Sequence, residues 1–506
     1  MTPTPFERFS HFAGETPDAA ALTFDGVTLS FGELERRSAR IAAALLAQGI
    51  IAGDRVALIA RNGIAQFELY FGCAKAGAIM LPLNWRLSSL EIQAIIADAE
   101  PALVIAATEF LPLLPVPNVI PTIEIDHEYN RWRDAAEPLA VTPPFDRDNC
   151  ILILYTSGTT GAPKGVTINH HNMSFLVRMA EESFGFTSAS VNLVAMPLFH
   201  IGGIGCGMWA LSQGGHTILL QHPDPDQVIK TIQIYGVTHA FFVPAVIQML
   251  VDVPGVDAMR LSSLQRILYG ASPISEALLK RAIAVFGCDF DHTYGMTETA
   301  GTVITLPPRD HDPDGPLAHR LRSCGRAMPW VELRLVDPAT GAQVATGDVG
   351  EIRIRSDMVT QGYWRKPSET AATVTADGWL CTGDAAYEDA DGYVYIQDRY
   401  KDMIVSGGEN IYPTEIENVL YDHPGVAQVA VIGVPHERWG ETPRAFVVAT
   451  HDLAPSQEEL VAFTQSRLAR YKCPTSVVFV RSLPRNASGK ILKKEMRDET
   501  WLRDHA

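Results

Sequence analysis

A short run of uncharged, mostly branched residues, CILIL (150–154), leads directly into the loop sequence YTSGTTGAPKG (155–165). The run predicts a buried strand, and the loop contains four Ser or Thr residues, three glycines and a single lysine. An ordinary turn needs only one or two glycines. Consecutive small residues at a strand end can direct several backbone N–H groups at one anion, and Lys164 would supply positive charge. The sequence therefore predicts a phosphate-binding loop at this point.

The loop is not a Walker loop. Lys164 follows Pro163 and precedes Gly165, whereas a Walker loop has Gly-Lys followed by Ser or Thr, which holds magnesium. A kinase or GTPase interpretation thus loses its main support. Taken alone, the segment is also compatible with a flexible surface loop.

Strands and helices are expected to alternate through the first part of the chain. Residues 29–50 predict a helix with Ser30 as N-cap, Glu33 three residues later and Gly49 as terminator. Strand and helix patterns then follow in turn over 54–60, 63–84, 216–222, 237–244 and 264–270. This alternation predicts an α/β fold of mostly parallel sheets flanked by helices.

The pattern changes after about residue 325. Residues 331–356 predict two or three strands with turns between them, which indicates a small antiparallel element. A helix followed by a strand is expected soon after residue 412, and the last hundred or so residues predict a small α+β domain. We therefore expect two domains, 1–400 and 401–506, with a boundary near 399–402.

Composition excludes several classes of function. The 506 residues are 47% hydrophobic and 20% charged, as in globular proteins of more than one domain. The net charge of 41 − 58 = −17 argues against nucleic acid or an anionic membrane as partner of a general basic surface. The seven cysteines are scattered without CxxC spacing, which disfavours disulfide frameworks and zinc sites.

The same features bear on localisation. The apolar segment 191–211 contains Pro197, His200 and several glycines, so a packed interior segment is expected and a membrane span is not. The first fifteen residues show no secretory signal pattern. A cytoplasmic protein without a transmembrane segment is the resulting expectation.

The loop sequence resembles the signature of the AMP-forming adenylating superfamily, which comprises acyl-CoA synthetases, adenylation domains of peptide synthetases and firefly-type luciferases. Five further motifs occur in the order typical of that family, and the likeness spans nearly the whole chain. They are PLFH (197–200), YGMTE (294–298), GWLCTGD (378–384), DRYKDMIVSGGENIYPTEIE (398–417) and PRNASGKILKK (484–494).

The resemblance implies an ATP site. Tyr294 would offer an aromatic face to adenine, Glu298 a hard oxygen ligand to Mg²⁺, and Asp384 a purely accepting carboxylate to the ribose hydroxyls. Without the family likeness, Glu298 could simply favour a helix N-terminus and Asp384 could be a turn residue. The implied ATP or AMP contacts are Thr156, Ser157, Gly158, Thr159, Thr160, Lys164, Gly270, Ala271, Ser272, Tyr294, Gly295, Met296, Thr297, Asp384, Ile396, Arg399 and Lys490.

The implied catalytic residues are Lys490, Glu298, Thr156 and His200. Lys490 would reach from the small domain and stabilise charge between the attacking carboxylate and the α-phosphate. His200 is either a substrate-contacting gate residue or a neutral core histidine. The neighbouring Lys493 and Lys494 are expected to be solvated surface charges.

The reaction implied by the family has two steps. A carboxylate attacks Mg-ATP to give acyl-AMP and pyrophosphate, and a thiol, expected to be that of coenzyme A, then displaces AMP. Lys490 must leave before the thiol approaches, so the small domain is expected to rotate about Lys401. Rotation would bring Ser406, Gly407 and Gly408 beside the pantetheine arm.

The acid is the least defined part. Candidate acyl-pocket residues are mostly apolar: Phe199, His200, Ile204, Phe242, Val243, Ala245 and Met296. An apolar lining suits a fatty acid, a cinnamate- or benzoate-like acid and a steroid side-chain acid about equally well, and we expect a medium- to long-chain fatty acid. An adenylation enzyme that loads a carrier protein, a luciferase-like oxidase and a non-catalytic nucleotide-binding regulator are less favoured. The expected cofactors are ATP, Mg²⁺ and coenzyme A, and a homodimer is possible by analogy with relatives.

Overall fold

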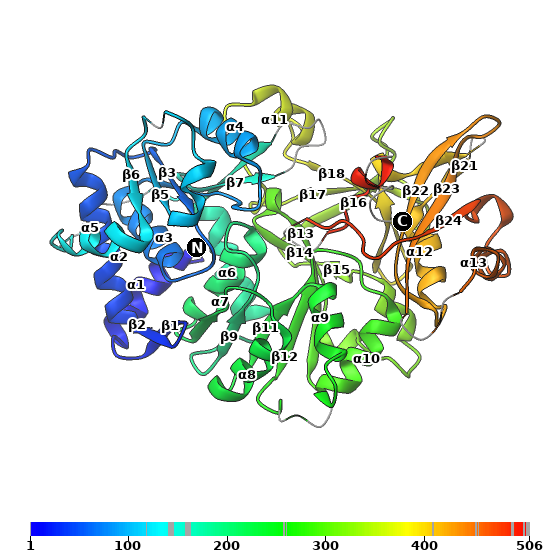
Figure 1. Cartoon of the computed structure of the whole chain (residues 1–506), viewed down its shortest axis with the longest axis horizontal. Coiled ribbons are helices and arrows are strands. Elements are labelled where there is room, and N and C mark those ends of the chain that lie inside the picture. The colour runs from blue at the N-terminus through cyan, green and yellow to red at the C-terminus, as the bar shows by residue number, and fades with distance from the viewer. Residues whose placement is uncertain are drawn as a thin grey trace.

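The computed structural model describes residues 2–117, 119–139, 146–156, 163–256, 259, 261–406, 409–450, 453, 455–486, 490–498 and 501. Three sheets form a large N-terminal part, and a fourth sheet with its helices forms a smaller C-terminal part, drawn in orange and red at the right of Figure 1. The helices are α1 (Pro5–Glu15), α2 (Phe31–Ala47), α3 (Ala65–Ala76), α4 (Ser89–Ala99), α5 (Asn130–Asp134), α6 (His170–Glu182), α7 (Ile201–Leu211), α8 (Pro225–Tyr235), α9 (Pro244–Val251), α10 (Glu276–Phe286), α11 (Pro367–Thr373), α12 (Pro413–Tyr421) and α13 (Gln457–Gln465).

The first sheet carries the predicted phosphate-binding loop. Its strand order is β6-β5-β3-β4-β7-β8, parallel except for the β7–β8 hairpin. The strands are β3 (Arg55–Ile59), β4 (Ile79–Pro82), β5 (Leu103–Ala106), β6 (Thr122–Glu124), β7 (Cys150–Thr156) and β8 (Lys164–Asn169).

The second sheet has nine strands in the order β15-β14-β13-β12-β11-β9-β10-β1-β2. Its central strands from β1 to β13 pair in parallel, and its edges are antiparallel. The strands are β1 (Ala20–Phe24), β2 (Val27–Ser30), β9 (Val191–Val194), β10 (His216–Leu219), β11 (His239–Phe242), β12 (Arg266–Gly270), β13 (Asp289–Met296), β14 (Gly301–Leu306) and β15 (Arg326–Ala327).

Buried helices join these two sheets through one core. Almost all of α3 is buried, and so is α7 from Gly203 onward. The two helices are in close contact, because a Cβ atom on Gly207 would lie 2.4 Å from the Phe67 ring. The apolar stretch 191–211 is therefore β9 and α7 inside the core, as predicted, and no helix among the described residues is long and apolar enough to cross a bilayer.

The remaining sheets are small. An antiparallel sheet contains β16 (Glu332–Val336), β17 (Gly350–Arg355), β18 (Leu380–Glu388) and β19 (Val394–Arg399). The C-terminal sheet contains β20 (Ile404–Ser406), β21 (Glu409–Ile411), β22 (Val426–His436), β23 (Gly440–Ala449) and β24 (Ser476–Phe479).

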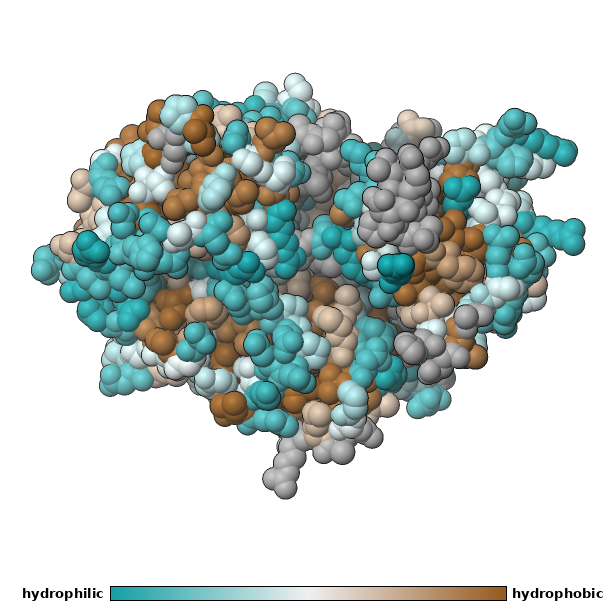
Figure 2. Space-filling model, in the orientation of Figure 1, coloured by the Kyte–Doolittle hydropathy of each residue, from teal (hydrophilic) through white to brown (hydrophobic). Residues whose placement is uncertain are grey.

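The expected fold class is confirmed: parallel-rich sheets with helices, a small antiparallel element and an α+β C-terminal part. The cap of α2 also forms as predicted, since the Ser30 hydroxyl accepts a hydrogen bond from the Glu33 N–H at 3.2 Å. On the face shown in Figure 2, hydrophobic groups are scattered among hydrophilic ones.

Candidate active site

Asp384, Arg399 and Tyr294 meet at the junction of two sheets. Asp384 on β18 lies opposite Arg399 on β19, and its Oδ1 is 3.1 Å from the Arg399 Nε. The Tyr294 hydroxyl on β13 donates a hydrogen bond to Asp384 Oδ2 at 2.7 Å. Burial, and after it the Asp384 charge, raises the pKa of Tyr294 well above its usual value. The carboxylate is thus oriented by a hydrogen bond at one oxygen and an ion pair at the other.

The small-residue turn after β12 lies beside Tyr294. Gly270 pairs with Thr293 in the parallel β12–β13 ladder, so Ala271, directly after β12, lies beside Tyr294 within β13. A Cβ atom on Gly270 would lie 2.1 Å from the Thr293 carbonyl oxygen, and Ala271 has a φ of +64°. Only glycine therefore fits at position 270. The turn continues into the half-buried Ser272.

Glu298 follows β13 and is buried, 7% exposed. Its Oε1 accepts a hydrogen bond from the Tyr363 hydroxyl at 2.9 Å, and burial raises its pKa. The Lys164 Nζ lies 5.1 Å from the centre of the Tyr363 ring. Tyr363 therefore connects the predicted metal ligand with the predicted phosphate ligand. Sequence reasoning missed it, because nothing in QGYWRKP (361–367) distinguishes it from a core aromatic residue.

The predicted phosphate-binding loop connects β7 to β8. Thr156 ends β7 and pairs with Lys164, which begins β8. The strand expected from CILIL is confirmed. Ser157, Gly158, Thr159 and Thr160 lie outside the described residues.

The other predicted nucleotide contacts lie around this region. Gly295 is exposed, and Met296 and Thr297 are half-buried at the end of β13. A Cβ atom on Gly295 would lie 2.0 Å from the Gly301 carbonyl oxygen. Ile396 lies on β19, three residues before Arg399, and packs partly buried against the main core.

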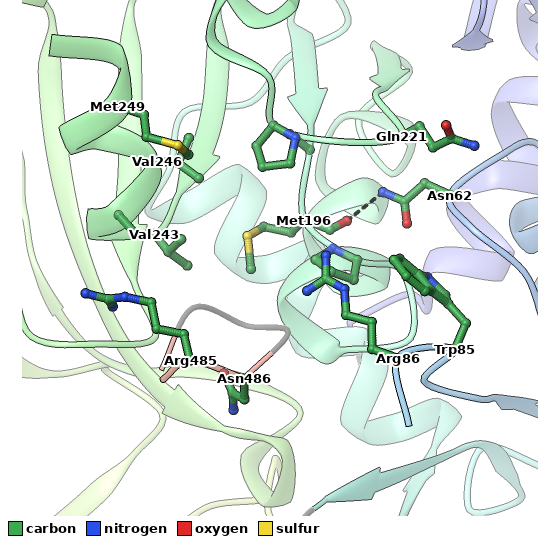
Figure 3. A pocket seen from close by; sticks show the side chains of 14 residues that line it. Asn62, Trp85, Arg86, Met196, Gln221, Val243, Val246, Met249, Arg485 and Asn486 are labelled. Carbon is green, nitrogen blue, oxygen red and sulfur yellow. Dashed lines mark hydrogen bonds between the residues drawn. The ribbon is translucent and has the colours of Figure 1, made fainter. Parts of the chain in front are cut away.

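A cavity opens where the two parts of the chain meet (Figure 3). The C-terminal part contributes Arg485 and Asn486, which face α9 and the Trp85–Arg86 segment across it. Asn62 lies on its wall and donates a hydrogen bond to the Met196 carbonyl at 2.9 Å. The full lining is Asn62, Trp85, Arg86, Ala195, Met196, Pro197, Gln221, Pro223, Val243, Ala245, Val246, Met249, Arg485 and Asn486.

The predicted acyl-pocket residues separate into two groups. Val243 and Ala245 line the cavity. Ile204 and Phe242 are buried in the main core, Phe199 is buried beside Trp85, and none of the three lines the cavity. The difference arises at a boundary: β11 ends at Phe242, and α9 begins at Pro244 with Val243 as its N-cap.

His200 is the N-cap residue of α7, and its ring lies 4.5 Å from that of Phe199. Its Nε2 is buried and has no hydrogen-bond partner among the described residues. Burial, and to a smaller extent the charge of Arg86, lowers its pKa to about 4. His200 is therefore neutral at pH 7, which fits substrate contact or core packing and does not fit a general acid.

The segment that carries Lys490 reaches the same cavity. The Asn486 N–H donates to the Lys490 carbonyl at 2.8 Å, and the Lys490 N–H donates to Asn486 Oδ1 at 2.8 Å. Because Asn486 lines the cavity, these two hydrogen bonds place Lys490 at the junction of the two parts. The connecting residues 487–489 lie outside the described residues.

The remaining predicted positions concern the link between the parts. Lys401 lies in the short helical turn Tyr400–Asp402 that directly follows β19. Ser406 ends β20, and Gly407 and Gly408 lie outside the described residues.

The expectation for Lys493 is wrong. Its side chain is 14% exposed, and its Nζ lies 3.2 Å from Asp398 Oδ2 and 3.0 Å from Glu417 Oε1. Lys494 is exposed, as expected. The two lysines are adjacent in sequence, so only the direction of each side chain in the fold distinguishes them.

The chain resembles known proteins over nearly its whole length. The family described as AMP-binding enzyme matches residues 9–364, and the AMP-binding enzyme C-terminal domain matches residues 415–490. The chain is 40% identical to the fatty acid–[acyl-carrier-protein] ligase ScoC of Streptomyces coeruleorubidus, over 97% of this chain and 95% of that protein. It is 39% identical to a feruloyl-CoA synthase of an Amycolatopsis species, over 95% and 96% of the two chains.

Among solved structures, ATP-bound MatB from Rhodopseudomonas palustris superimposes with a TM-score of 0.90 at 31% identity, over 98% of this chain and 99% of that one. Apo MatB superimposes with a TM-score of 0.81, over 99% of each chain. The whole-chain arrangement described here is therefore more similar to that of the ATP-bound form.

Fold, site and similarity define an adenylate-forming enzyme, and the chain belongs to the AMP-binding enzyme family. More particularly, it is an AMP-forming acid–thiol ligase of the acyl-CoA synthetase type, which activates a carboxylic acid with ATP.

Proposed function

We propose that this ligase joins a medium- to long-chain fatty acid to coenzyme A through an acyl-AMP intermediate. The observation that carries the proposal is that Asn486, which is hydrogen-bonded to Lys490, lines a largely apolar cavity between the two parts. The 40% identity to a fatty acid–[acyl-carrier-protein] ligase supports the substrate class, and the acceptor of that relative is a carrier protein. The transfer of the acyl group from acyl-AMP to coenzyme A is the second step.

ATP would be held by the residues around Asp384. A carboxylate already oriented by Tyr294 and Arg399 can accept hydrogen bonds from both ribose hydroxyls. Gly270 has no side chain to obstruct the base, and the Tyr294 ring has a flat face, so both suit adenine. Thr156, Thr297 and Lys164 would bind the phosphates.

Glu298 would hold Mg²⁺. Among the described residues, no group of three or more His, Cys, Asp and Glu side chains could hold a metal ion. A single buried carboxylate nevertheless suits Mg²⁺, which keeps several waters and binds one or two carboxylates together with substrate phosphates. When bound, the ion would offset the negative charge of the phosphates.

Lys490 would act in the first step only. Its ammonium group would stabilise the charge that develops between the carboxylate and the α-phosphate. For the second step the C-terminal part would rotate about Lys401, withdrawing Lys490 and bringing Ser406, Gly407 and Gly408 to the thiol. The position of Lys401 in the short turn that directly follows β19 supports this role.

A second substrate class is a hydroxycinnamate-like acid. The 39% identity to a feruloyl-CoA synthase favours it, as do the polar side chains of Asn62 and Gln221 on the cavity wall. Apolar pockets discriminate weakly between acids that differ by one methylene group, so chain length is expected to be a graded preference.

A panel of acids tests the proposal. Fatty acids of increasing length, ferulate and benzoate are each incubated with ATP, Mg²⁺ and either coenzyme A or a phosphopantetheinylated carrier protein, and AMP and thioester are measured. We expect the highest kcat/KM for a fatty acid with coenzyme A. Preference for ferulate would replace the substrate class, and turnover only with the carrier protein would replace the acceptor.

A further inference from the structure

Three titratable side chains from both sides of the predicted hinge meet in a buried cluster. Lys493 Nζ lies between Asp398 Oδ2 and Glu417 Oε1, at 3.2 and 3.0 Å. The side chains of Asp398, Glu417 and Lys493 are only 8%, 12% and 14% exposed. We refer to these three residues as the hinge cluster.

The hinge cluster spans the two parts of the chain. Asp398 belongs to β19 of the N-terminal part and precedes Lys401. Glu417 is fixed within the C-terminal part, because its Oε1 accepts a hydrogen bond from the Val431 N–H of β22 at 2.7 Å. Lys493 follows Lys490 by three residues and precedes Met496, which is buried in the C-terminal core.

Asp398 accepts hydrogen bonds from two donors of the C-terminal part at one oxygen. The Thr414 hydroxyl of α12 donates to Asp398 Oδ2 at 3.2 Å, the oxygen that also accepts from Lys493. Rotation about Lys401 would separate Asp398 from both donors. The Lys493–Glu417 contact lies within the C-terminal part and would persist.

The charges around Lys493 favour its ionised form. Burial alone would lower the pKa of Lys493, but Glu417 and Asp398, with a smaller contribution from Asp402, raise it above its usual value. Asp402 is in turn 3.5 Å from the Arg497 guanidinium. A buried ion pair that loses one partner is costly, because the other charge stays desolvated. The cost of separating Lys493 from Asp398 therefore opposes rotation of the C-terminal part.

We propose that Lys493 is a positioning residue for acyl-AMP formation: by bridging Asp398 and Glu417, it stabilises the arrangement in which the Lys490 segment reaches the cavity. The proposal rests on the two-step cycle proposed above. It adds that the contact with Asp398 breaks before thiol transfer, so that the contact favours the first step alone. The similarity of this arrangement to ATP-bound MatB is consistent with that order.

The test separates the two half-reactions. Acid-dependent ATP–pyrophosphate exchange measures the first, and thioester formation from supplied acyl-adenylate and coenzyme A measures the second. Asp398→Asn weakens only the contact across the hinge, and Lys493→Met removes both contacts. We expect each variant to lower exchange about tenfold, as is typical of coupling between two states, and to leave thioester formation unchanged or faster.

Two further variants complete the design. Lys493→Arg keeps a cation at the same position and is expected to show most of the exchange that Lys493→Met loses. Because Lys493→Met keeps a long side chain without the charge, such recovery would be due to the charge. Lys494→Met removes the adjacent exposed lysine and is expected to leave both half-reactions unchanged. If Lys493→Met does not fold because Glu417 is left unpaired, Asp398→Asn decides, since its Lys493–Glu417 pair is intact.

The outcomes distinguish the inference from the function beneath it. Exchange by Asp398→Asn at the wild-type rate, or equal loss in both half-reactions, overturns the positioning role. Wild-type protein that shows no exchange with any acid overturns the proposed function, and this inference with it.

Discussion

Asp384 and Glu298 are both buried carboxylates, but their partners differ. Asp384 has a partner at each oxygen, a hydrogen bond from Tyr294 and an ion pair with Arg399, whereas among the described residues Glu298 accepts one side-chain hydrogen bond, from Tyr363. A carboxylate fixed at both oxygens suits the recognition of a rigid sugar, and one with fewer partners suits a cation that brings its own waters. These differences lead to separate predictions for the two residues.

Replacing Tyr294 by Phe tests the orientation of Asp384. The ring remains for adenine, but the hydrogen bond to Asp384 is lost, and hydrogen bonds to charged groups contribute about 1.5–3 kcal/mol. We expect the KM for ATP to rise about tenfold with little change in kcat, measured by steady-state kinetics. Tyr395→Phe is the matched control, because the Tyr395 hydroxyl donates to another carboxylate, Asp389, at 3.1 Å. An unchanged KM in Tyr294→Phe would contradict the orienting role.

The pH dependence tests Glu298. Burial raises its pKa above the ordinary 4.5, and only the ionised form can bind a cation. We therefore expect acyl-AMP formation in wild-type protein to fall as pH drops through a pKa above 4.5, measured as kcat/KM against pH. An acid limb that ends at or below 4.5 would contradict this assignment.

Ionised Glu298 is expected to support activity but to lower the stability of the folded protein. Because the folded state binds more protons than the unfolded state above pH 4.5, ionised Glu298 lowers the free energy of unfolding at neutral pH. We expect Glu298→Gln to abolish acyl-AMP formation while the free energy of unfolding at pH 7 stays equal or rises, measured by urea denaturation. A clearly destabilised variant would show that Glu298 has a structural role.

Paired strands position the candidate active site through close backbone contacts. The β12–β13 pairing brings Gly270 against Thr293, with no space for a side chain. Forced overpacking in a core costs about 1–3 kcal/mol. We expect Gly270→Ala to lower the free energy of unfolding by at least that amount and to impair ATP binding, measured by denaturation and calorimetry. Gly14→Ala in α1, where a Cβ atom would meet nothing within 4 Å, is the control.

Elements were also what the sequence predicted best. Capping and periodicity predicted α2, the strand before the phosphate-binding loop and the alternation of strands and helices, because capping and periodicity are local properties of the sequence. Of the predicted acyl-pocket residues, Val243 and Ala245 line the cavity. Phe242 ends a buried strand and Val243 caps the next helix, so adjacent residues have different environments that composition does not reveal.

Contacts between distant segments were beyond sequence reasoning. Tyr363 approaches Glu298 from a segment 65 residues away, and Lys493 meets Asp398 across 95 residues. Motif likeness located Asp384, Arg399 and Tyr294 because each belongs to a recognisable pattern. Their mutual hydrogen bonds depend on how two sheets meet, and no local signal encodes that.

At the scale of the whole molecule, buried histidines set the response to acid. Burial is the main cause that lowers the pKa to about 4 in five of them: His170, His200, His239, His292 and His311. In the unfolded chain they would bind protons near pH 6.5, so stability is lost as pH falls from 6.5 towards 4. Four carboxyl groups with a raised pKa act in the opposite direction, Asp291, Glu298, Glu388 and Glu417, and burial raises the pKa of Asp291 to about 7.

We therefore expect the free energy of unfolding to be lower at pH 5 than at pH 7, measured by urea denaturation at constant ionic strength. His311→Gln, which replaces one such histidine outside the proposed site, should reduce the difference. Equal stability at the two pH values would contradict the assignment of these histidines as neutral in the folded state.

The central claim is that Lys490 of the C-terminal part completes the site for acyl-AMP formation and is not needed in the second step. The direct test compares Lys490→Ala with wild-type protein in both half-reactions. We expect ATP–pyrophosphate exchange to fall by about 100-fold or more, as when one charge-stabilising donor is removed, and thioester formation from supplied acyl-adenylate to be largely retained. Equal loss in both half-reactions, or undiminished exchange, would contradict the claim.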